Sequence, residues 1–299
     1  MKITVIGAVN IDITAKCSYP AVMRDSNIGV IKKTHGGVGR NIVHNCALLG
    51  LDCSFVSAVG ADESAGEVLG ELKALGININ DVYISREISS GTYICIIDEG
   101  GDMLIGLNDM QIVDCINRDF LASCDLSADI LALDANLSGE ALEYALSNKK
   151  GMVFAEPVSV KKAVNLVPFL DKIDIIKPNV YEAEALSGVS TGSESGIYAA
   201  GEALLKRGLK EVYITCGSNG VYAFSQSCGA MHYNALPGVI KNANGAGDAF
   251  AAGVLYSLAH GFEPEQTCAF ASGCAQFAMM SDEAVNKDLN AKKIAERIN

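Results

Sequence analysis

The sequence predicts an α/β fold of three layers, in which helices cover both faces of a mainly parallel central sheet. Short, almost continuously apolar runs alternate along the chain with segments of helical periodicity, as expected for strands that are buried on both faces. Hydrophobic residues make up 49% of the 299 residues and charged residues 19%, so the chain can bury a large core and does not have the composition of a disordered protein. The length allows one large α/β domain or two smaller ones.

The individual elements follow from the apolar pattern. We expect strands at the short apolar runs Ile3–Ile6, Ser54–Ser57, Ile130–Leu133, Met152–Ala155, Ile173–Ile176 and Val212–Thr215. Helical spacing of apolar residues predicts helices at Asn41–Leu49, Ala65–Leu75, Glu140–Leu146, Val180–Leu186, Ile197–Arg207, Ala249–Phe262 and Thr267–Ser281. The last two helices are uncharged over long stretches but too short and too polar to cross a bilayer, so we expect them to be buried.

Two segments interrupt this alternation and predict a small β lid. Residues 28–33, and the pair 92–97 and 103–107 joined around two glycines, have the pattern of antiparallel strands. We expect residues 14–33 and 91–110 to form the lid over the carboxyl ends of the main strands, where open α/β sheets bind ligands. The main domain then comprises residues 1–13, 34–90 and 111–299. A sheet extension without a lid function is the alternative.

Charge and cysteine content exclude several classes of protein. The formal charge of −12 argues against a nucleic-acid partner and against an anionic membrane surface, because both select clustered Lys and Arg. The ten cysteines lack the spacing of a zinc site or of a disulfide framework. The segment Lys2–Ile6 already reads as a strand, which leaves no room for the charged start, apolar core and cleavage site of a secretory signal. We therefore expect a cytoplasmic protein.

The most informative motif is the segment Asn242–Phe250, which contains the sequence Gly245-Ala246-Gly247-Asp248 before a long apolar helix. Small residues at a helix start let main-chain N–H groups approach a phosphate, and the helix dipole favours an anion there. An acid beside such a site is unfavourable unless it takes a proton from a nucleophile, so we interpret Asp248 as the general base of a phosphoryl transfer. A first-turn Asp that only complements the dipole is the alternative.

Two polar motifs lie near the amino terminus. Asn10 and Asp12 alternate with apolar residues after the first strand, so both side chains should point the same way and could bind paired sugar hydroxyls, or serve as turn residues. In the segment His35–Asn41, Gly37 permits close approach to a ligand, and Asn41 could cap the helix or bind substrate. Arg40 reads as a solvated helix residue, with a place beside the ligand as the alternative. No G-x-G-x-x-G or Walker A sequence is present.

Two further motifs follow strands in the second half. Asn179 is an expected N-cap with Glu182 as its capping-box partner, and the functional alternative is that Glu182 organises Mg²⁺ through water. The segment Thr215–Gly220 contains Gly217 and Gly220 and could line nucleotide phosphates or simply turn the chain.

These blocks occur in one order along nearly the full chain, and in that order they resemble the ribokinase-like (PfkB) carbohydrate kinase family. The resemblance implies a ribokinase-like fold, ATP, Mg²⁺, a lid over the sugar and transfer of the γ-phosphoryl group to a primary hydroxyl. It makes Asp248 the catalytic base, and the family's anion hole then matches Gly245, Ala246 and Gly247. Its sugar-binding positions match Asn10, Asp12, Gly37 and Asn41. Its phosphate and magnesium motif matches Asn179 and Glu182, and its nucleotide loop matches Thr215, Gly217 and Gly220.

The chain differs from the usual family sequence at one place before the Gly-Ala-Gly-Asp motif. The family commonly has Asp-Thr where this chain has residues 242–244, Asn-Ala-Asn, which puts the monovalent-cation (K⁺) site of relatives in doubt. Together with G-G-V-G-R-N, Asn108-Asp109-Met110, Glu156-Pro157-Val158-Ser159 and K-P-N-V-Y-E-A-E, this Asn makes the chain look most like the pseudouridine kinase branch. The resemblance implies the 5′-hydroxyl of a C-linked nucleoside as acceptor, and we expect the Asn108 region to contact the uracil edge. A ribokinase or adenosine kinase activity, or a sensor that binds a nucleoside without catalysis, are the alternatives. By analogy with the family, we expect a homodimer through the lid.

Overall fold

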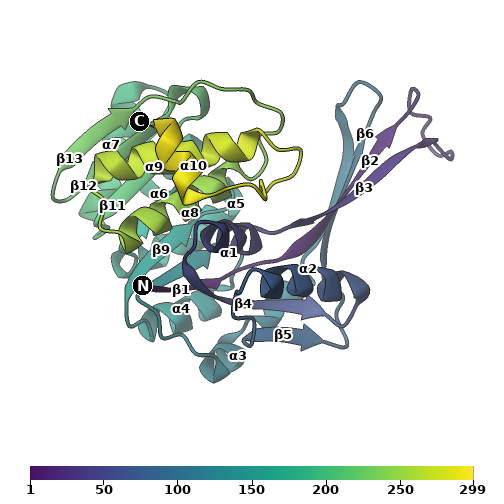
Figure 1. Cartoon of the computed structure of the whole chain (residues 1–299), viewed down its shortest axis with the longest axis horizontal. Helices are drawn as coiled ribbons and strands as arrows, with labels where there is room; N and C mark the ends of the chain where they lie inside the picture. The colour runs from purple at the N-terminus through teal and green to yellow at the C-terminus, as the bar shows by residue number, and fades with distance from the viewer. Residues whose placement is uncertain (299) are drawn as a thin grey trace.

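The computed structural model describes residues 1–298. Within this range, nine strands form a sheet in the order β13-β12-β11-β10-β9-β8-β1-β4-β5 (Figure 1). All neighbours pair in parallel except β12, which is antiparallel to β11 and β13. The strands are β1 (Lys2–Ile6), β4 (Asp52–Gly60), β5 (Val82–Ser85), β8 (Ile130–Asp134), β9 (Met152–Glu156), β10 (Ile175–Ile176), β11 (Glu211–Thr215), β12 (Val221–Ser225) and β13 (Gly229–Tyr233).

Helices cover both faces of this sheet, which confirms the predicted three-layer fold. One apolar cluster joins the sheet to α1 (Val38–Leu48), α2 (Glu63–Ala74), α8 (Ala246–Ala259), α9 (Pro264–Met279) and α10 (Ala291–Ile298). A second cluster joins it to η1 (Gln111–Cys115), α3 (Arg118–Ser123), α4 (Gly139–Ser147), α5 (Val160–Ala163), η2 (Val164–Lys172), α6 (Val180–Ser187) and α7 (Glu194–Lys206). Helix α8 is apolar on all sides, and it is buried between α1 and α9 for that reason.

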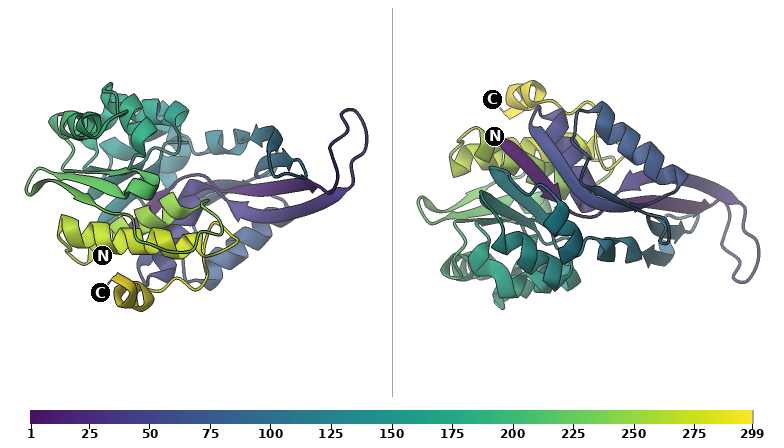
Figure 2. Two further views of the ribbon diagram at one scale, coloured as in Figure 1. Left: turned by 90° about the horizontal axis from the view of Figure 1, so that it is seen from above. Right: turned by 90° about the horizontal axis from the view of Figure 1, so that it is seen from below.

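A second sheet, in the order β3-β2-β6-β7 in the described part of the chain, projects from this body (Figures 1 and 2). Its strands are β2 (Asn10–Cys17), β3 (Gly29–Gly36), β6 (Gly91–Ile97) and β7 (Met103–Asp109). The predicted antiparallel pair is confirmed as β6 and β7. Strand β2 was not predicted, because its partners β3 and β6 come from later parts of the chain.

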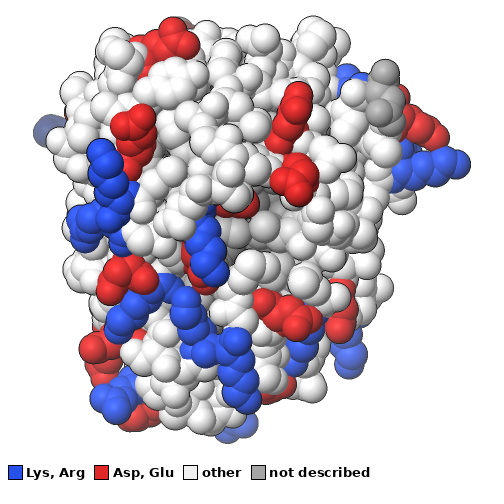
Figure 3. Space-filling view, turned by 90° about the vertical axis from the view of Figure 1, so that its left-hand side faces the viewer, with Lys and Arg blue, Asp and Glu red and all other residues white. Residues whose placement is uncertain are grey.

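The two sheets meet where a ligand could bind. Only three residues separate the end of β1 from the start of β2, and the carboxyl ends of β8, β9 and β11 lie at the same edge of the large sheet. None of the helices within residues 1–298 is long and apolar enough to cross a membrane. On the face shown in Figure 3, Lys and Arg side chains are interspersed with Asp and Glu.

Candidate functional site

The turn before α8 leaves main-chain donors exposed at the start of this helix. Gly245, the N-cap residue, has a φ of 80°, a left-handed conformation that favours glycine. The N–H groups of Gly247 and Asp248 make no hydrogen bond to any described residue, whereas the N–H of Ala246 donates to the Ala243 carbonyl over 3.3 Å. The turn itself thus uses the Ala246 N–H, and the role of Gly245, Ala246 and Gly247 as an anion hole stays a prediction.

Asp248 lies in the first turn of α8 and lines a cavity of about 530 Å³. Its Oδ2 accepts a 2.8 Å hydrogen bond from Nδ2 of Asn41 on α1. Burial raises the pKa of Asp248 to about 6, and the charge of Asp134 adds to the rise. The Asn41 hydrogen bond and the charges of Lys177 and Arg40 limit it. A carboxylate with this pKa is ionised at neutral pH and can still take up a proton, as a general base must.

The predicted sugar-binding pair lies at the start of β2. Nδ2 of Asn10 donates a 2.6 Å hydrogen bond to Oδ1 of Asp12, so the two side chains lie together, as their alternation along the chain predicts. Burial raises the pKa of Asp12, against the Asn10 hydrogen bond and the charge of Arg40. Strand β3 brings Gly36 so close that a Cβ atom there would collide with the Asp12 carboxylate. Gly37 follows as the N-cap of α1 with a φ of 97°.

The far wall of the cavity is formed by the start of α6 and the end of β11, including Asn179, Glu182, Thr215 and Gly217. Oδ1 of Asn179 accepts the Glu182 N–H at 3.0 Å, and Oε2 of Glu182 accepts the Asn179 N–H at 2.8 Å. The expected capping box is therefore present. Gly220 does not line the cavity; with a φ of 80° it turns the chain between η3 (Gly217–Asn219) and β12.

Comparison with known proteins assigns this arrangement to a family. The profile of the pfkB family carbohydrate kinases matches residues 1–290. The chain belongs to the PfkB family of carbohydrate kinases. It is 33% identical over 297 residues to a pseudouridine kinase of Escherichia coli (strain K12), covering 98% of this chain and 95% of the relative.

Two further relatives of this PfkB family member bear on its substrate and its fold. A guanosine-inosine kinase of Exiguobacterium acetylicum is 28% identical over 276 residues, which cover 86% of this chain and 87% of that one. The solved structure of a carbohydrate kinase from Agrobacterium tumefaciens has a TM-score of 0.85 at 26% identity, covering 99% of this chain and 96% of that one. The chain is thus a sugar or nucleoside kinase of the PfkB family.

A buried ion pair of this PfkB kinase was not predicted from the sequence. Glu156 ends β9 and Lys177 follows β10, so neighbouring parallel strands bring Oε2 and Nζ to 3.0 Å. Burial raises the pKa of Glu156 to about 8, against the attraction of Lys177. Burial acts in the opposite direction on Lys177, but the charges of Glu156 and Glu182 raise its pKa, so the ammonium stays protonated. Its Nζ lies 3.4 Å from the position that a Cβ atom of Gly247 would take.

Asp134, the last residue of β8, is a second buried acid that sequence patterns did not reveal. Its Oδ2 accepts the N–H groups of Ala8 at 2.8 Å and Gly39 at 3.0 Å. Burial raises the pKa of Asp134, and its main-chain hydrogen bonds oppose the rise. Ala8 lies just before Asn10, and Gly39 lies in α1 just before Asn41. The Asp134 carboxylate therefore holds these two segments of the site together.

Asn108 lies in the same row of the small sheet as Asp12, two strands away, because Asp12 is opposite Tyr93 and Tyr93 is opposite Asn108. It lies exposed in β7, opposite Tyr93 of β6. No hydrogen bond between described residues connects it to Asp12 or Asp248. Its contact with a substrate remains a prediction that depends on the position of the small sheet.

Proposed function

We propose that this kinase transfers the γ-phosphoryl group of ATP to the 5′-hydroxyl of pseudouridine, with Mg²⁺ as metal cofactor. One observation carries the phosphoryl transfer: the Asp248 carboxylate lies in the cavity between the Asn41 amide and the free N–H groups at the start of α8. The choice of nucleoside is supported by the identity of 33% with a pseudouridine kinase over nearly the whole chain.

The acceptor is bound at the root of the small sheet. Asp12 and Asn10 bind the ribose hydroxyls, because a carboxylate beside an amide offers strong acceptors together with a donor. The β3-β2-β6-β7 sheet acts as the lid that excludes water. Asp248 accepts the proton of the 5′-hydroxyl while that oxygen forms its bond to phosphorus and the bond from phosphorus to the leaving nucleoside diphosphate breaks.

The phosphoryl group is held from the opposite side. The N–H groups of Gly247 and Asp248 donate to its oxygens, at the positive end of the α8 dipole. Lys177 supplies a full positive charge beside these donors. Thr215 and Gly217, which line the same cavity, border the rest of the nucleotide.

The residues present fit Mg²⁺ bound in the manner of a nucleotide enzyme. Mg²⁺ keeps several waters and takes only one or two protein carboxylates in addition to phosphates, and no group of three or more His, Cys, Asp and Glu within residues 1–298 could enclose a metal. Glu182 lines the cavity and gives one oxygen to the Asn179 N–H, with its second oxygen for a metal-bound water. Mg²⁺ held in this way would offset the negative charge of the nucleotide phosphates.

A panel of acceptors tests the substrate. We expect ADP release with pseudouridine to exceed that with uridine, adenosine, inosine, ribose and fructose 6-phosphate. The same panel on Asn108→Ala should show a smaller preference for pseudouridine over uridine, since this change removes a polar contact to the base. Unchanged discrimination in that variant would remove Asn108 from the site, and a wild-type preference for another acceptor would replace pseudouridine.

A purine nucleoside kinase is the second candidate, and the guanosine-inosine kinase that is 28% identical to this chain favours it. Inosine in the panel separates the two. A sensor that binds the nucleoside without catalysis would release no ADP with any acceptor.

We propose further that two copies pair through their lids. Large apolar side chains are exposed on both edge strands of the small sheet, including Val30 and Ile31 of β3 and Ile105 and Leu107 of β7, which are 59 to 73% exposed. Exposed apolar area of this kind marks an interaction surface. Sedimentation velocity should give a dimer that Ile31→Asp converts to a monomer, and a monomeric wild type at micromolar concentration would contradict the pairing.

A further inference from the structure

Arg40 is a buried charge beside the site, and it lines a second cavity of about 340 Å³ together with Glu71 and Lys287. It stands between Gly39 and Asn41 in the first turns of α1 and is only 4% exposed. The expectation of a solvated helix residue is therefore wrong. Burying a guanidinium is costly unless acids and hydrogen-bond acceptors surround it, so its partners indicate what it does.

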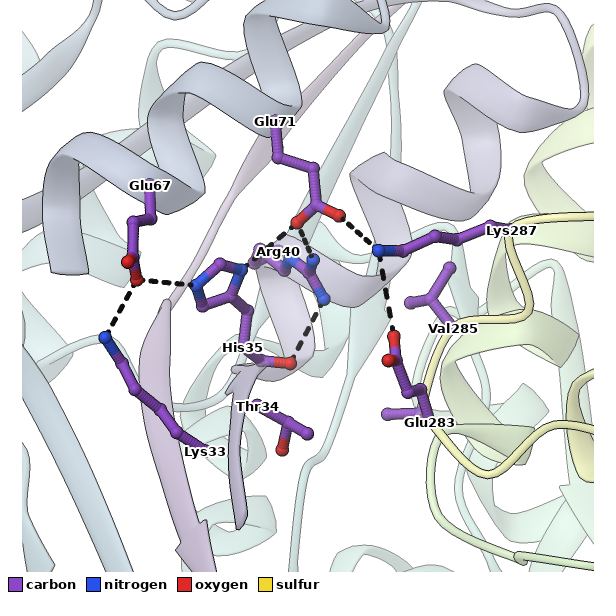
Figure 4. A pocket seen from close by; sticks show the side chains of 10 residues that line it. Lys33, Thr34, His35, Arg40, Glu67, Glu71, Glu283, Val285 and Lys287 are labelled. Atoms are coloured by element: carbon purple, nitrogen blue, oxygen red, sulfur yellow. Dashed lines mark hydrogen bonds and ion pairs between the residues drawn. The ribbon is translucent and has the colours of Figure 1, made fainter.

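Acidic and main-chain partners hold the guanidinium in place (Figure 4). Nη2 of Arg40 lies 2.6 Å from Oε2 of Glu71 on α2, and Nη1 donates to the carbonyl of His35 at 3.2 Å. Glu71 also contacts the His35 ring and Lys287, each at 3.1 Å. Burial opposes the ionisation of Glu71, but the hydrogen bonds of His35 and Lys287 and the charge of Arg40 lower its pKa to about 2. Glu71 is therefore an anion at any working pH, and it anchors Arg40.

Arg40 also donates a hydrogen bond to Asn41, the residue that donates to Asp248. Nη1 donates a 3.0 Å hydrogen bond to Oδ1 of Asn41, and Nδ2 of the same amide donates 2.8 Å to Oδ2 of Asp248. A guanidinium has donors and no acceptor, whereas an amide has one end of each kind. Arg40 therefore permits only one orientation of the Asn41 amide. The reverse orientation would place the amide NH₂ against the guanidinium and the amide oxygen against the Asp248 carboxylate.

We infer that Arg40 is a positioning residue for the phosphoryl transfer, which turns the donor end of the Asn41 amide toward the base Asp248. The inference rests on the proposed role of Asp248 as the general base. This orientation also affects the pKa of Asp248. A carboxylate that accepts a hydrogen bond keeps its negative charge to lower pH than one that faces an amide oxygen.

The other charges around Asp248 come from different elements and stay in place when Arg40 is changed. They are Lys177 before α6, Asp134 at the end of β8 and Glu156 at the end of β9. Arg40 also acts on Asp248 by its charge alone. A test must therefore keep the positive charge at position 40 but remove the planar set of N–H donors of the guanidinium. The substitution Arg40→Lys does both.

We expect Arg40→Lys to raise the pKa of Asp248 by about one unit, the size of a hydrogen bond to a charged group. The acid limb of the kcat profile should move with it, so that kcat falls about fivefold at pH 6 and changes less than about twofold at pH 8.5. Lys287→Ala is the matched control, because Lys287 contacts Glu71 but not Asn41, and it should leave the limb in place. A merely structural role would lower kcat equally at all pH values.

A second measurement needs no turnover. The ¹³C carboxyl resonance of Asp248, titrated by NMR in the free protein, should show the same rise in Arg40→Lys. In an Asn41→Ala background the same substitution should produce no rise, since the amide through which Arg40 acts is gone. A rise that persists in that background, or no rise at all, overturns the inference.

The NMR titration also separates this inference from the proposed function. If no acceptor gives ADP release, the proposed function fails while the titration still decides the role of Arg40. Should Arg40→Lys fail to fold, Glu71→Gln takes its place, because it loosens the guanidinium from α2 and should move the pKa of Asp248 in the same direction.

Discussion

Replacing Asp248 by Asn is expected to lower kcat by about 10²- to 10⁴-fold, the usual contribution of a positioned general base. The affinity for the nucleoside should change less than about tenfold, because proton transfer occurs only in the transition state. The amide keeps the shape of the carboxylate and can still accept the hydrogen bond from Asn41. Steady-state ADP release gives kcat, and calorimetric titration gives the affinity.

The pH dependence of the wild type follows from the same carboxylate. Burial raises the pKa of Asp248 to about 6, and only the ionised form can accept the proton. The kcat should therefore be constant above about pH 7 and fall as the pH falls through 6. A profile that is flat between pH 5 and 8, or wild-type turnover in Asp248→Asn, would contradict the assignment of the base.

The stability of Asp248→Asn distinguishes loss of chemistry from loss of folding. The pKa of Asp248 rises from 3.8 to about 6 on folding, so the folded state binds this proton more tightly and loses stability as the pH rises between these values. Above about pH 6, the ionised Asp248 carboxylate lowers the free energy of unfolding by up to about 3 kcal/mol. Asn does not ionise. We expect the variant to unfold at a higher denaturant concentration than wild type at pH 7 and at nearly the same concentration at pH 4.

Such an exchange of stability for activity is typical of catalytic acids held in unfavourable surroundings. It also explains why the sequence could point to Asp248: an acid at a glycine-rich helix start contradicts its local electrostatics unless it has a chemical role. The capping box of Asn179 and Glu182 was predictable for the opposite reason, since all of its hydrogen bonds lie within one helical turn.

The rest of the site depends on contacts that local patterns do not contain. Arg40 and Lys177 look like ordinary solvated cations in the sequence, and both are buried because acids from other elements, Glu71 and Glu156, reach them. Strand β2 was missed for a similar reason, because its two partners come from later segments of the chain. Whether the Ala246 N–H is free depends on how one turn closes, which no spacing rule reports.

Replacing Lys177 by Met is expected to lower kcat by about 10²- to 10³-fold, the range found when one preorganised group that stabilises transition-state charge is removed. The ammonium lies beside Gly247 at the start of α8 and has no equivalent among the cavity-lining residues. Because Lys177 also holds down the pKa of Asp248, the acid limb of kcat should move to higher pH. Lys287→Met, an exposed lysine outside this cavity, is the control and should keep wild-type kcat.

The loss of stability caused by Lys177→Met should be larger at high pH, because Lys177 is the partner of the buried Glu156 carboxyl group. Glu156 has a pKa of about 8 in the wild type, and the charge of Lys177 limits the rise. Without Lys177 this pKa rises further, so Glu156 is neutral at pH 7 and leaves no unpaired buried charge. Folded Glu156 then holds its proton to higher pH than in wild type, so the stability of the variant continues to fall above pH 8 while that of the wild type levels off. Urea titrations at pH 7 and pH 9 should therefore show a larger difference at pH 9. A difference of several kcal/mol already at pH 7 would contradict this account, and it would mean that the pair serves the fold more than the reaction.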